Sequence, residues 1–230
     1  MTMNKVACLD HGFVRLVDSM GNDLSVVRSA RVSYDAAWRT GDNTGSDERL
    51  INYLWRNGHT SPFESVTFTF EVRAPIFVLR QWHRHRTWSF NEVSARYTEL
   101  PSDYYVPKVD MIGVQSKDNK QGRDLESRAD ADEVCELIDK TCQAAFETYS
   151  NLLERGVPRE LARTVLPLAT YSHMFATVNL MNLLKFIGLR RHEHSQHEIW
   201  IYADAMLELI REHVPASIEA FEKHTLKTAG

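Results

Sequence analysis

Arginines gather in one short stretch of the chain, residues 73–96, against a single acid, Glu92. They are Arg73, Arg80, Arg84, Arg86 and Arg96, and no lysine accompanies them. A guanidinium is a planar fork that binds phosphate or carboxylate through two parallel hydrogen bonds. Arg80 and Arg84, four apart on an expected helix, would repel each other unless an anion lies between them. The stretch therefore predicts an anion site, with a solvated basic face as the alternative.

The end of this stretch, SFNEVSARY (residues 89–97), supplies the mixed polar groups of a ligand site. Hydroxyl, amide, carboxylate and guanidinium groups lie close together beside two aromatic rings. This composition predicts a polar site and not a core strand. Glu92 has a helix-capping or ion-pairing role as its alternative. Trp82 and Trp88 are expected in the core, where large aromatic side chains usually pack.

A late histidine-rich run, RRHEHSQHE (residues 190–198), raises the possibility of a metal site, since histidine and carboxylate side chains together bind zinc or iron. The run contains no HExxH pattern, however. We expect these histidines to make local hydrogen bonds and the protein to hold no metal. His83 and His85 in the arginine stretch could be catalytic bases, but a role in orienting the arginines is at least as plausible for His83.

Several elements must position these residues. Residues 66–73 alternate apolar and polar side chains, which predicts a strand with one buried face. A helix is expected to begin at Pro75 and to run into the arginines, and another to cover residues 132–154 and end at Gly156. From Pro158 onward the sequence predicts successive helices, broken near Pro167, Gly188 and Pro215. Few strands and many helices indicate an α+β fold.

The remaining segments are connections and shorter elements. Residues 6–21 predict a strand or hairpin that ends at a turn at Gly21 and Asn22, and residues 24–34 predict a helix. The polar stretch 38–48 is expected to be a loop, with Ser46 capping a helix that Gly58 closes. Residues 107–130 are expected to form an extended surface loop.

The composition excludes several classes of protein. The chain has 230 residues, 43% of them hydrophobic and 25% charged, which is ordinary for one globular domain. Its net charge of -4 gives no general attraction to nucleic acid, and no apolar stretch reaches the length of a membrane span or a signal peptide. The three cysteines form no CxxC pair, so we expect neither disulfides nor a cysteine-rich zinc site. A cytoplasmic protein without nucleic-acid or membrane partners is expected.

The segment RHRTWSFNEVSARY (residues 84–97) closely resembles the signature RHRxxSxNExSxRY of flavin-dependent thymidylate synthases, with every fixed position filled. The similarity extends through most of the chain. Further similar segments are HGFVRLVDSMGNDLSVVRSARVSYD, NGHTSPFESVTFTFEVRAPIFVLRQW, GVPRELARTVLPL and GLRRHEHSQHEI. The resemblance implies one domain over residues 1–230, with an α+β fold in which helices predominate over a small antiparallel sheet.

The resemblance also implies a function. Members of the family are homotetramers whose active sites lie between subunits. They bind FAD, take electrons from NADPH, and methylate dUMP to dTMP with 5,10-methylenetetrahydrofolate, releasing tetrahydrofolate. The other kind of thymidylate synthase uses a cysteine nucleophile, whereas no cysteine of this chain lies near the arginine stretch in sequence. With a flavin, the cofactor carries the electron transfer and the protein orients the rings and stabilises charge.

Site residues follow from the matched motif positions. Arg190 is the catalytic residue, expected to polarise the uracil ring. The residues expected to bind dUMP are Gln81, Trp82, His83, Arg84, Glu92, Val93, Ser94, Ala95, Arg96, Arg163 and Arg190. Those expected to bind FAD are Ser61, Arg84, His85, Arg86, Glu92, Asn179, Leu180, Met181 and Lys185, with His59 near the flavin. Met181 and Lys185 depart from the pattern, since family members often carry Arg and Asn there.

Two functions from other classes remain as alternatives. A nucleotide- or RNA-binding module could use the arginines without catalysis, and its binding would weaken uniformly with salt. A metal-dependent phosphohydrolase built on the late histidines would lose activity when a chelator removes its metal.

Overall fold

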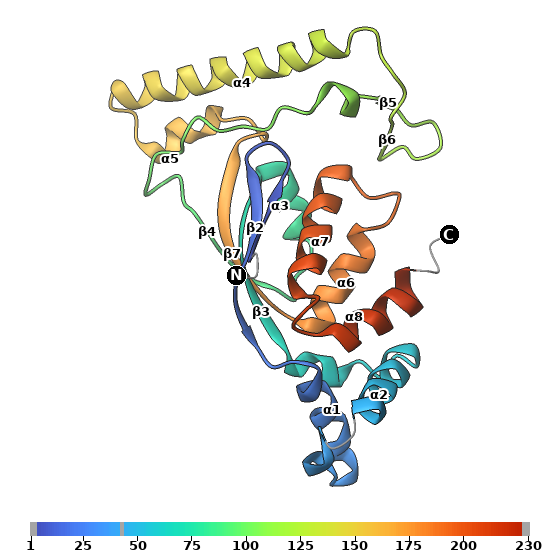
Figure 1. The fold of residues 1–230 in the computed structure, drawn as a ribbon. Coiled ribbons are helices and arrows are strands. Elements are labelled where there is room, and N and C mark those ends of the chain that lie inside the picture. Colours follow the sequence, from blue (N-terminus) through green and yellow to red (C-terminus); the bar gives the residue numbers. More distant parts are fainter. Residues whose placement is uncertain (1–3, 42–43, 227–230) are drawn as a thin grey trace.

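The computed structural model describes residues 4–41 and 44–226, which fold around a five-stranded antiparallel sheet (Figure 1). The strand order is β1–β2–β3–β7–β4. The strands are β1 (Lys5–Cys8), β2 (Gly12–Met20), β3 (Thr67–Pro75), β7 (Tyr171–Asn179) and β4 (Ser89–Glu92). A separate small hairpin pairs β5 (Val114–Gln115) with β6 (Arg123–Asp124). The α+β fold with a small antiparallel sheet is confirmed.

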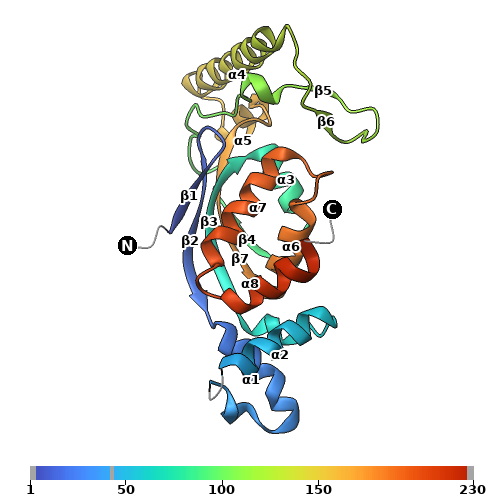
Figure 2. The same cartoon turned by 45° about the vertical axis from the view of Figure 1, so that its right-hand side comes forward.

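One face of the sheet forms the core. Phe68, Phe70 and Val72 of β3 are fully buried, as is Val66 just before the strand, so the predicted alternation is confirmed. The covering helices lie on one side of the sheet (Figure 2). They are α3 (Ile76–Trp82), α6 (Leu180–Arg190), α7 (His197–Ile210) and α8 (Pro215–Phe221). The opposite face carries polar contacts instead, such as the one between the hydroxyls of Thr69 and Thr177 at 3.0 Å.

Helices also extend the molecule beyond the two ends of the sheet (Figure 1). At one end lie α1 (Asp23–Arg31) and α2 (Thr44–Arg56), and at the other α4 (Ala131–Glu154) and α5 (Arg159–Ala162). Short 3-10 turns cover Val32–Tyr34, Ala37–Arg39, Ser61–Ser65, Val109–Met111 and Arg163–Val165, and a π-helical turn covers Glu222–Leu226. The predicted β1–β2 hairpin, the turn at Gly21 and α1 are confirmed, and Asn22 caps α1 by accepting a hydrogen bond from the Leu24 amide.

Three predicted helix boundaries are wrong. Ser46 lies inside the first turn of α2 and does not cap it, because the helix begins at Thr44. The loop predicted over 38–48 is therefore shorter, and its residues 42–43 lie outside the described residues. Pro75 ends β3 and caps α3, which stops at Trp82 before Arg84. Gly188 lies within α6 and does not break it; an added Cβ there would make only ordinary van der Waals contact with Thr225 and Phe221.

The largest error concerns strands late in the chain. Residues 171–179 form β7, an interior strand between β3 and β4, and not part of a helical run, because Met174, Ala176 and Val178 alternate into the core while His173 and Thr177 face outward. Residues 89–92 form β4, an edge strand whose polar side chains stay accessible, so a strand and a polar site coexist there. The loop predicted over 107–130 contains the β5–β6 hairpin.

None of the helices in the described part of the chain is both long and apolar enough to cross a membrane. The cytoplasmic location stays a prediction. Cys8 and Cys142 are buried and Cys135 is partly buried, and all three are free thiols, as expected.

Candidate active site

The end of α3 and the turn after it present the arginine segment. Once the helix has stopped at Trp82, backbone bonds from Arg84 to the Gln81 carbonyl (3.3 Å) and from His85 to the Trp82 carbonyl (2.9 Å) close a tight turn. Arg84 and Arg86 project from this turn and are exposed. Arg80 and Arg84 therefore do not share one helix, and the expected repulsion along a helix face does not apply. No carboxylate among the described residues pairs with Arg84 or Arg86 within 4 Å.

Buried aromatic rings hold this turn against the core. Trp82 is fully buried and stacks on Phe186 of α6, with 4.8 Å between the ring centroids, and Trp88 packs edge-on against both rings. The interpretation of both tryptophans as core residues is confirmed. The Trp82 side chain cannot reach a ligand from this position, so its expected contact with dUMP would have to use the backbone.

Arg190, the last residue of α6, contacts the turn that follows α3. Its Nε donates to Nε2 of His85 at 3.0 Å, and its Nη2 donates to the carbonyl of Gln81 at 3.3 Å. The Gln81 side chain in turn hydrogen bonds to Gln196, which lies just before α7. Three of the predicted site residues thus form one network, in which Arg190 lies more than one hundred positions from His85 and Gln81.

The protonation state of His85 follows from this contact. Burial and the neighbouring charge of Arg190 lower the pKa of His85 from 6.5 to about 4. His85 is therefore neutral near pH 7, and its Nε2 keeps the lone pair that accepts from Arg190. Burial also lowers the pKa of the Arg190 guanidinium, which has no carboxylate partner within the described residues. A half-buried cation held only by neutral acceptors is well suited to stabilise a ligand that carries or develops negative charge.

Glu92 ends β4, opposite Met174 of β7. The buried hydroxyl of Ser172 donates to its Oε1 at 2.5 Å, and His83 Nε2 lies 3.9 Å from its Oε2. His83 is close enough to be an ion-pair partner of Glu92 but only at a long distance. The ion-pairing alternative for Glu92 is therefore supported only in part. Two predicted residues, His83 and Glu92, lie together here.

A third group joins the end of the motif to α5. Arg96 Nη2 lies 3.7 Å from Oε2 of Glu160, and Nε of Arg163 donates to the Glu160 carbonyl at 3.4 Å. All three residues are exposed, and the distances are long. Between Glu92 and Arg96, a turn in which the Ser94 carbonyl accepts from the Tyr97 and Thr98 amides carries Val93, Ser94 and the buried Ala95. The structure brings two of the arginines predicted to bind dUMP, Arg96 and Arg163, to one place.

The residues expected to bind FAD do not all lie near this place. Asn179 is the last residue of β7 and lies opposite Thr67. Arg96, Glu160 and Arg163 adjoin the other end of that strand. A nine-residue strand at about 3.3 Å per residue separates its two ends by about 26 Å. Ser61 and His59 precede β3 at the Asn179 end, where His59 packs edge-on against Tyr53. One chain therefore carries the predicted residues in separate groups.

Most side chains at the start of α6 make contacts within the fold. Asn179 Oδ1 accepts from the Asn182 amide at 2.9 Å and caps the helix, and Leu180 is fully buried, so any FAD contact of Leu180 would use its backbone. Met181 packs partly against the core and Lys185 is exposed. The FAD assignments of these residues stay predictions.

A cavity of about 510 Å³ opens beside the Arg190 network. Gln81, Arg190 and Gln196 line it, together with Gln121 from the β5–β6 hairpin and His192 and His194 from the loop before α7. Its volume lies within the usual range for small-molecule sites, about 300–1,000 Å³. A ligand in this cavity would face the unpaired guanidinium of Arg190.

Known proteins resemble the chain over nearly its whole length. Residues 15–216 match the family model described as thymidylate synthase complementing protein. The flavin-dependent thymidylate synthase of Thermotoga neapolitana is 45% identical, over 97% of this chain and 96% of that protein. The corresponding protein of Treponema denticola is 47% identical, over 94% of this chain and 81% of its own length. The chain belongs to the flavin-dependent thymidylate synthase family.

A solved structure supports the same family fold. The UMP/dUMP methylase PolB from Streptomyces cacaoi, bound with 5-Br dUMP, superposes with a TM-score of 0.86 at 40% identity, covering 96% of this chain and 98% of that one. The predicted family is thus confirmed, and the chain is an enzyme of the flavin-dependent thymidylate synthase type.

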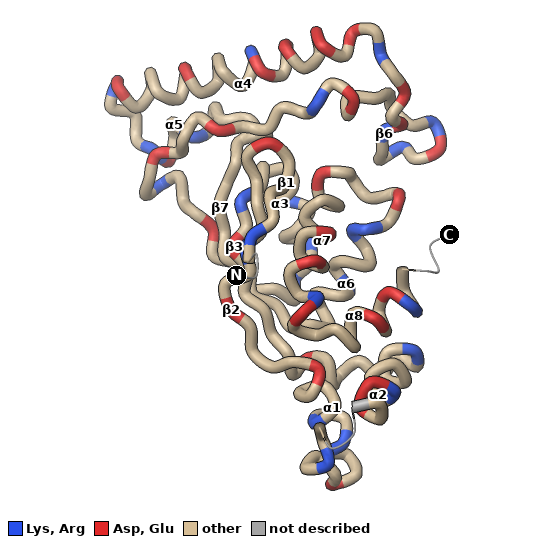
Figure 3. The backbone as a smooth tube through the Cα atoms, viewed as in Figure 1, with Lys and Arg blue, Asp and Glu red and all other residues tan. Residues whose placement is uncertain are grey.

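Neither alternative to this family gains support from the described residues. No group of three or more His, Cys, Asp or Glu side chains is placed to hold a metal ion in the described part of the chain. His192 and His194 instead lie near each other, with 4.9 Å between their ring centroids, and the His194 amide donates to Nδ1 of His192. Along the backbone in Figure 3, Lys and Arg residues are interspersed with Asp and Glu residues in the described part of the chain.

Sequence reasoning missed three residues that position the site of this family member. They are Ser172, which holds Glu92; Glu160, which contacts Arg96 and Arg163; and Gln196, which holds Gln81. Ser172 lies on the strand that the sequence did not reveal. Glu160 lies in the first turn of α5, and Gln196 lies within the histidine-rich run of residues 190–198. Only the folded chain shows what these residues touch.

Proposed function

We propose that this protein converts dUMP to dTMP, using 5,10-methylenetetrahydrofolate as the one-carbon donor and NADPH as the reductant through bound FAD, and releasing tetrahydrofolate. The observation that carries the proposal is the placement of Arg190. Its guanidinium is half-buried, is held by the neutral acceptors His85 and Gln81, and lines a cavity of nucleotide-binding size. The relatives' names and the 5-Br dUMP in the solved relative support the same substrate.

In this function Arg190 acts on the uracil ring. An uncompensated guanidinium beside a pyrimidine carbonyl stabilises the ring ionised at N3, which accepts a hydride and a carbon unit more readily. The neutral state of His85 matters because a protonated imidazole would repel Arg190 and could not accept its hydrogen bond. The network thus fixes the cation in place before the substrate binds.

The nucleotide phosphate would be bound by the second arginine group. Arg96 and Arg163 both lie beside Glu160, at distances too long to satisfy either guanidinium fully. A phosphate dianion is a stronger partner for the two guanidinium forks than the exposed Glu160 carboxylate is for Arg96 or the Glu160 backbone carbonyl is for Arg163. Both side chains can therefore turn from Glu160 to the phosphate without breaking a short contact.

The exposed guanidiniums of Arg84 and Arg86, which lack acidic partners, fit the pyrophosphate of FAD. His85, Glu92, Ser61 and Asn179 would add contacts. When bound, the flavin supplies the electron transfer between NADPH and the substrates. The protein's own residues would bind and orient the flavin and hold dUMP beside it.

The separation of the predicted residues along the sheet supports shared active sites. Asn179 and Ser61 lie about 26 Å from the Arg96 end of β7, farther apart than one nucleotide site requires. In the proposed homotetramer, groups from opposite ends of different subunits would complete each site. Assayed at dUMP well below the wild-type KM, two impaired variants with defects in different groups, such as Arg96→Ala and Asn179→Ala, should then regain activity when mixed subunits reassemble, whereas no regained activity would argue against sharing.

The proposed function is tested directly with purified protein. We expect bound flavin absorbance and formation of dTMP from dUMP that stops when NADPH or methylenetetrahydrofolate is omitted. Protein that binds no flavin after incubation with FAD, or that forms no dTMP when fully supplied, would contradict the proposal.

A second substrate has a specific observation in its favour. The Streptomyces cacaoi relative, also solved with 5-Br UMP, superposes with a TM-score of 0.85 at 39% identity. The same assay should therefore compare UMP with dUMP at equal concentrations. We expect dUMP to be preferred, because the curated relatives at 45–47% identity are thymidylate synthases; a higher kcat/KM for UMP would reverse this assignment.

A further inference from the structure

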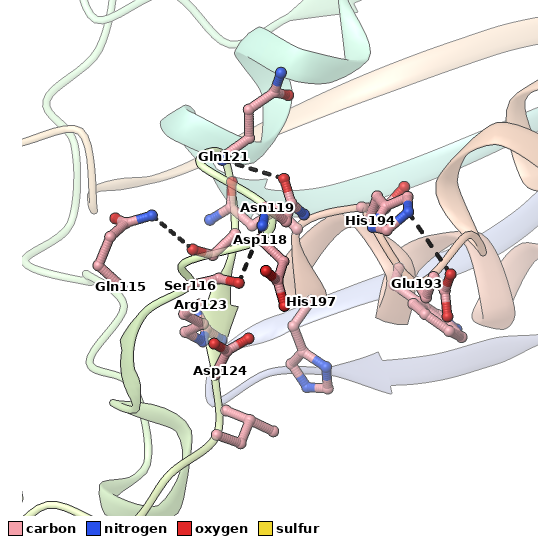
Figure 4. A pocket seen from close by; sticks show the side chains of 15 residues that line it. Gln115, Ser116, Asp118, Asn119, Gln121, Arg123, Asp124, Glu193, His194 and His197 are labelled. Carbon is pink, nitrogen blue, oxygen red and sulfur yellow. Dashed lines mark hydrogen bonds and ion pairs between the residues drawn. The ribbon is translucent and has the colours of Figure 1, made fainter.

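The β5–β6 hairpin lies beside the loop that leads into α7, and a second cavity separates them (Figures 1 and 4). This cavity has a volume of about 650 Å³. Asn119, Gln121 and Arg123 line it from the hairpin, and Gln196, His197 and Trp200 line it from the start of α7. None of the expected binding residues named from the family motif belongs to its lining. A pocket of this size therefore remains without an assigned occupant.

A buried ion pair anchors the hairpin in this position. Nη2 of Arg123 lies 2.8 Å from Oε1 of Glu198, which is only 1% exposed, and the hydroxyl of Tyr105 donates to the same oxygen at 3.1 Å. Burial alone would raise the pKa of Glu198, but the hydrogen bond and charge of Arg123 lower it overall. Because losing one partner would leave a charge buried and unpaired, the pair resists separation.

Contacts within the hairpin fix its tip. The Gln115 side chain donates to the Gly122 carbonyl at 2.9 Å, and Asn119 Oδ1 accepts from the Gln121 amide at 3.2 Å. Gly113 before β5 has a positive φ of 57°, and an added Cβ there would lie 2.3 Å from the Asp124 carbonyl oxygen, so glycine is required. These local restraints give the tip a defined conformation over the cavity.

The hairpin cavity adjoins the cavity beside Arg190. Gln121, His194, Ser195 and Gln196 line both cavities, and Gln196 bonds to Gln81, whose carbonyl accepts from Arg190. A molecule in the hairpin cavity would therefore lie next to a nucleotide held at Arg190. This placement suits a second reactant rather than an unrelated ligand.

The lining also indicates what such a reactant carries. Amide side chains can pair with the N–H and C=O groups of an amide-bearing heterocycle, and the lining also includes the aromatic residues Trp200 and His197. The same cavity is lined by three acidic residues, Asp118, Asp124 and Glu193. The lining also includes Arg123, but its charge is already paired with Glu198. This excess of carboxylates disfavours a phosphate or a polyanionic tail as the occupant.

From these observations we infer that the hairpin cavity binds the heteroaromatic, amide-bearing ring of a co-substrate, and that Gln121 is a binding residue for it. The inference rests on the proposed function, in which two co-substrates carry such a ring. One is the pterin of methylenetetrahydrofolate and the other is the nicotinamide of NADPH. Gln121 qualifies because its exposed side chain lines both cavities from the hairpin tip.

The test compares Gln121→Ala with Gln143→Ala in the complete protein. Gln143 is an exposed residue of α4 that bonds only to Glu147 one turn along, so it serves as a matched loss of one amide. The KM is measured separately for dUMP, methylenetetrahydrofolate and NADPH. Binding of tetrahydrofolate and of NADP⁺ is measured by calorimetry. Loss of one or two neutral hydrogen bonds should raise one co-substrate's KM and Kd by about three- to ten-fold.

The folate measurements and the NADPH measurements together identify which co-substrate ring binds in the hairpin cavity. A rise confined to the folate measurements assigns the pterin, and a rise confined to the NADPH and NADP⁺ measurements assigns the nicotinamide. Unchanged values for both, or a rise for dUMP alone, would overturn the inference while the wild-type activity still stands. Absence of dTMP formation by the wild type would instead refute the proposed function. Gln121→Asn keeps the amide, so its co-substrate KM and Kd should lie between those of Gln121→Ala and wild type. This intermediate result would distinguish loss of binding from a folding defect.

Discussion

Two groups of arginines in this molecule are held in opposite ways. Arg190 is half-buried, and its short contacts with His85 and Gln81 come from a turn locked by buried aromatic rings. Arg96 and Arg163 are exposed; Arg96 lies 3.7 Å from the Glu160 carboxylate, and Arg163 donates to the Glu160 backbone carbonyl at 3.4 Å. The first group is fixed before any ligand binds, whereas the second can rearrange.

This difference separates two roles within one proposed active site. A cation that must stabilise charge developing on a ring gains from a fixed position and a low-dielectric surrounding. A cation that binds a fully charged phosphate needs reach more than rigidity, because the phosphate keeps the same charge throughout the reaction. Loss of Arg190 should therefore affect kcat, and loss of Arg96 should affect mainly the KM for dUMP.

The largest effect is expected for Arg190→Ala. Removing a preorganised charge donor typically lowers kcat by about 100- to 1,000-fold, and the variant should retain its fold because Arg190 ends a helix whose buried face is untouched. Steady-state rates of dTMP formation and thermal unfolding check both parts. Arg128→Ala, which removes an exposed pair with Asp130, is the control and should keep the wild-type rate. A kcat within a few-fold of wild type for Arg190→Ala would refute the distinction.

A smaller effect of a different kind is expected for Arg96→Ala. Loss of one charged hydrogen bond to phosphate should raise the KM for dUMP by about 10- to 100-fold while kcat changes much less. Glu160→Gln removes the competing carboxylate and should leave the KM for dUMP unchanged or slightly lower. Kinetics at varied dUMP with the other substrates saturating measure both. If kcat for Arg96→Ala falls as far as for Arg190→Ala, the two groups share one role.

The smallest effect concerns the pH dependence of stability. Because the pKa of His85 falls from 6.5 to about 4 on folding, the unfolded chain binds the proton first as the pH is lowered. The contribution of His85 should therefore be fully present above pH 6.5 and be lost progressively between pH 6.5 and about 4. His85→Gln keeps an acceptor for Arg190 but cannot titrate. Denaturant unfolding across this range should show a shallower decline for the variant; identical slopes would contradict the assigned pKa.

The sequence predicted the chemistry of the site better than its framework. Each arginine and polar residue of residues 84–97 could be identified because the motif is local and its spacing specific. β3 was equally clear, since Phe68, Phe70 and Val72 alternate with polar residues. Strand β7 was not, because Met174 and Ala176 also suit helices and the segment runs directly into α6.

The contacts between distant residues could not be predicted from one sequence. Arg190 and His85 are 105 positions apart, and Ser172 and Glu92 are 80 apart, so nothing local reveals that they meet. The hairpin cavity has the same origin. Gln121 lies in a stretch without periodicity, and in the fold the ion pair between Arg123 and Glu198 joins its hairpin to the start of α7, beside Gln196.

The most direct test of the account is dTMP formation by wild type and Arg190→Ala, both loaded with flavin and supplied with dUMP, methylenetetrahydrofolate and NADPH. The account predicts that both proteins bind flavin, that wild type forms dTMP, and that the variant forms it at least about 100-fold more slowly. Flavin-loaded wild type that forms no dTMP, or a variant that matches the wild-type rate, would contradict it.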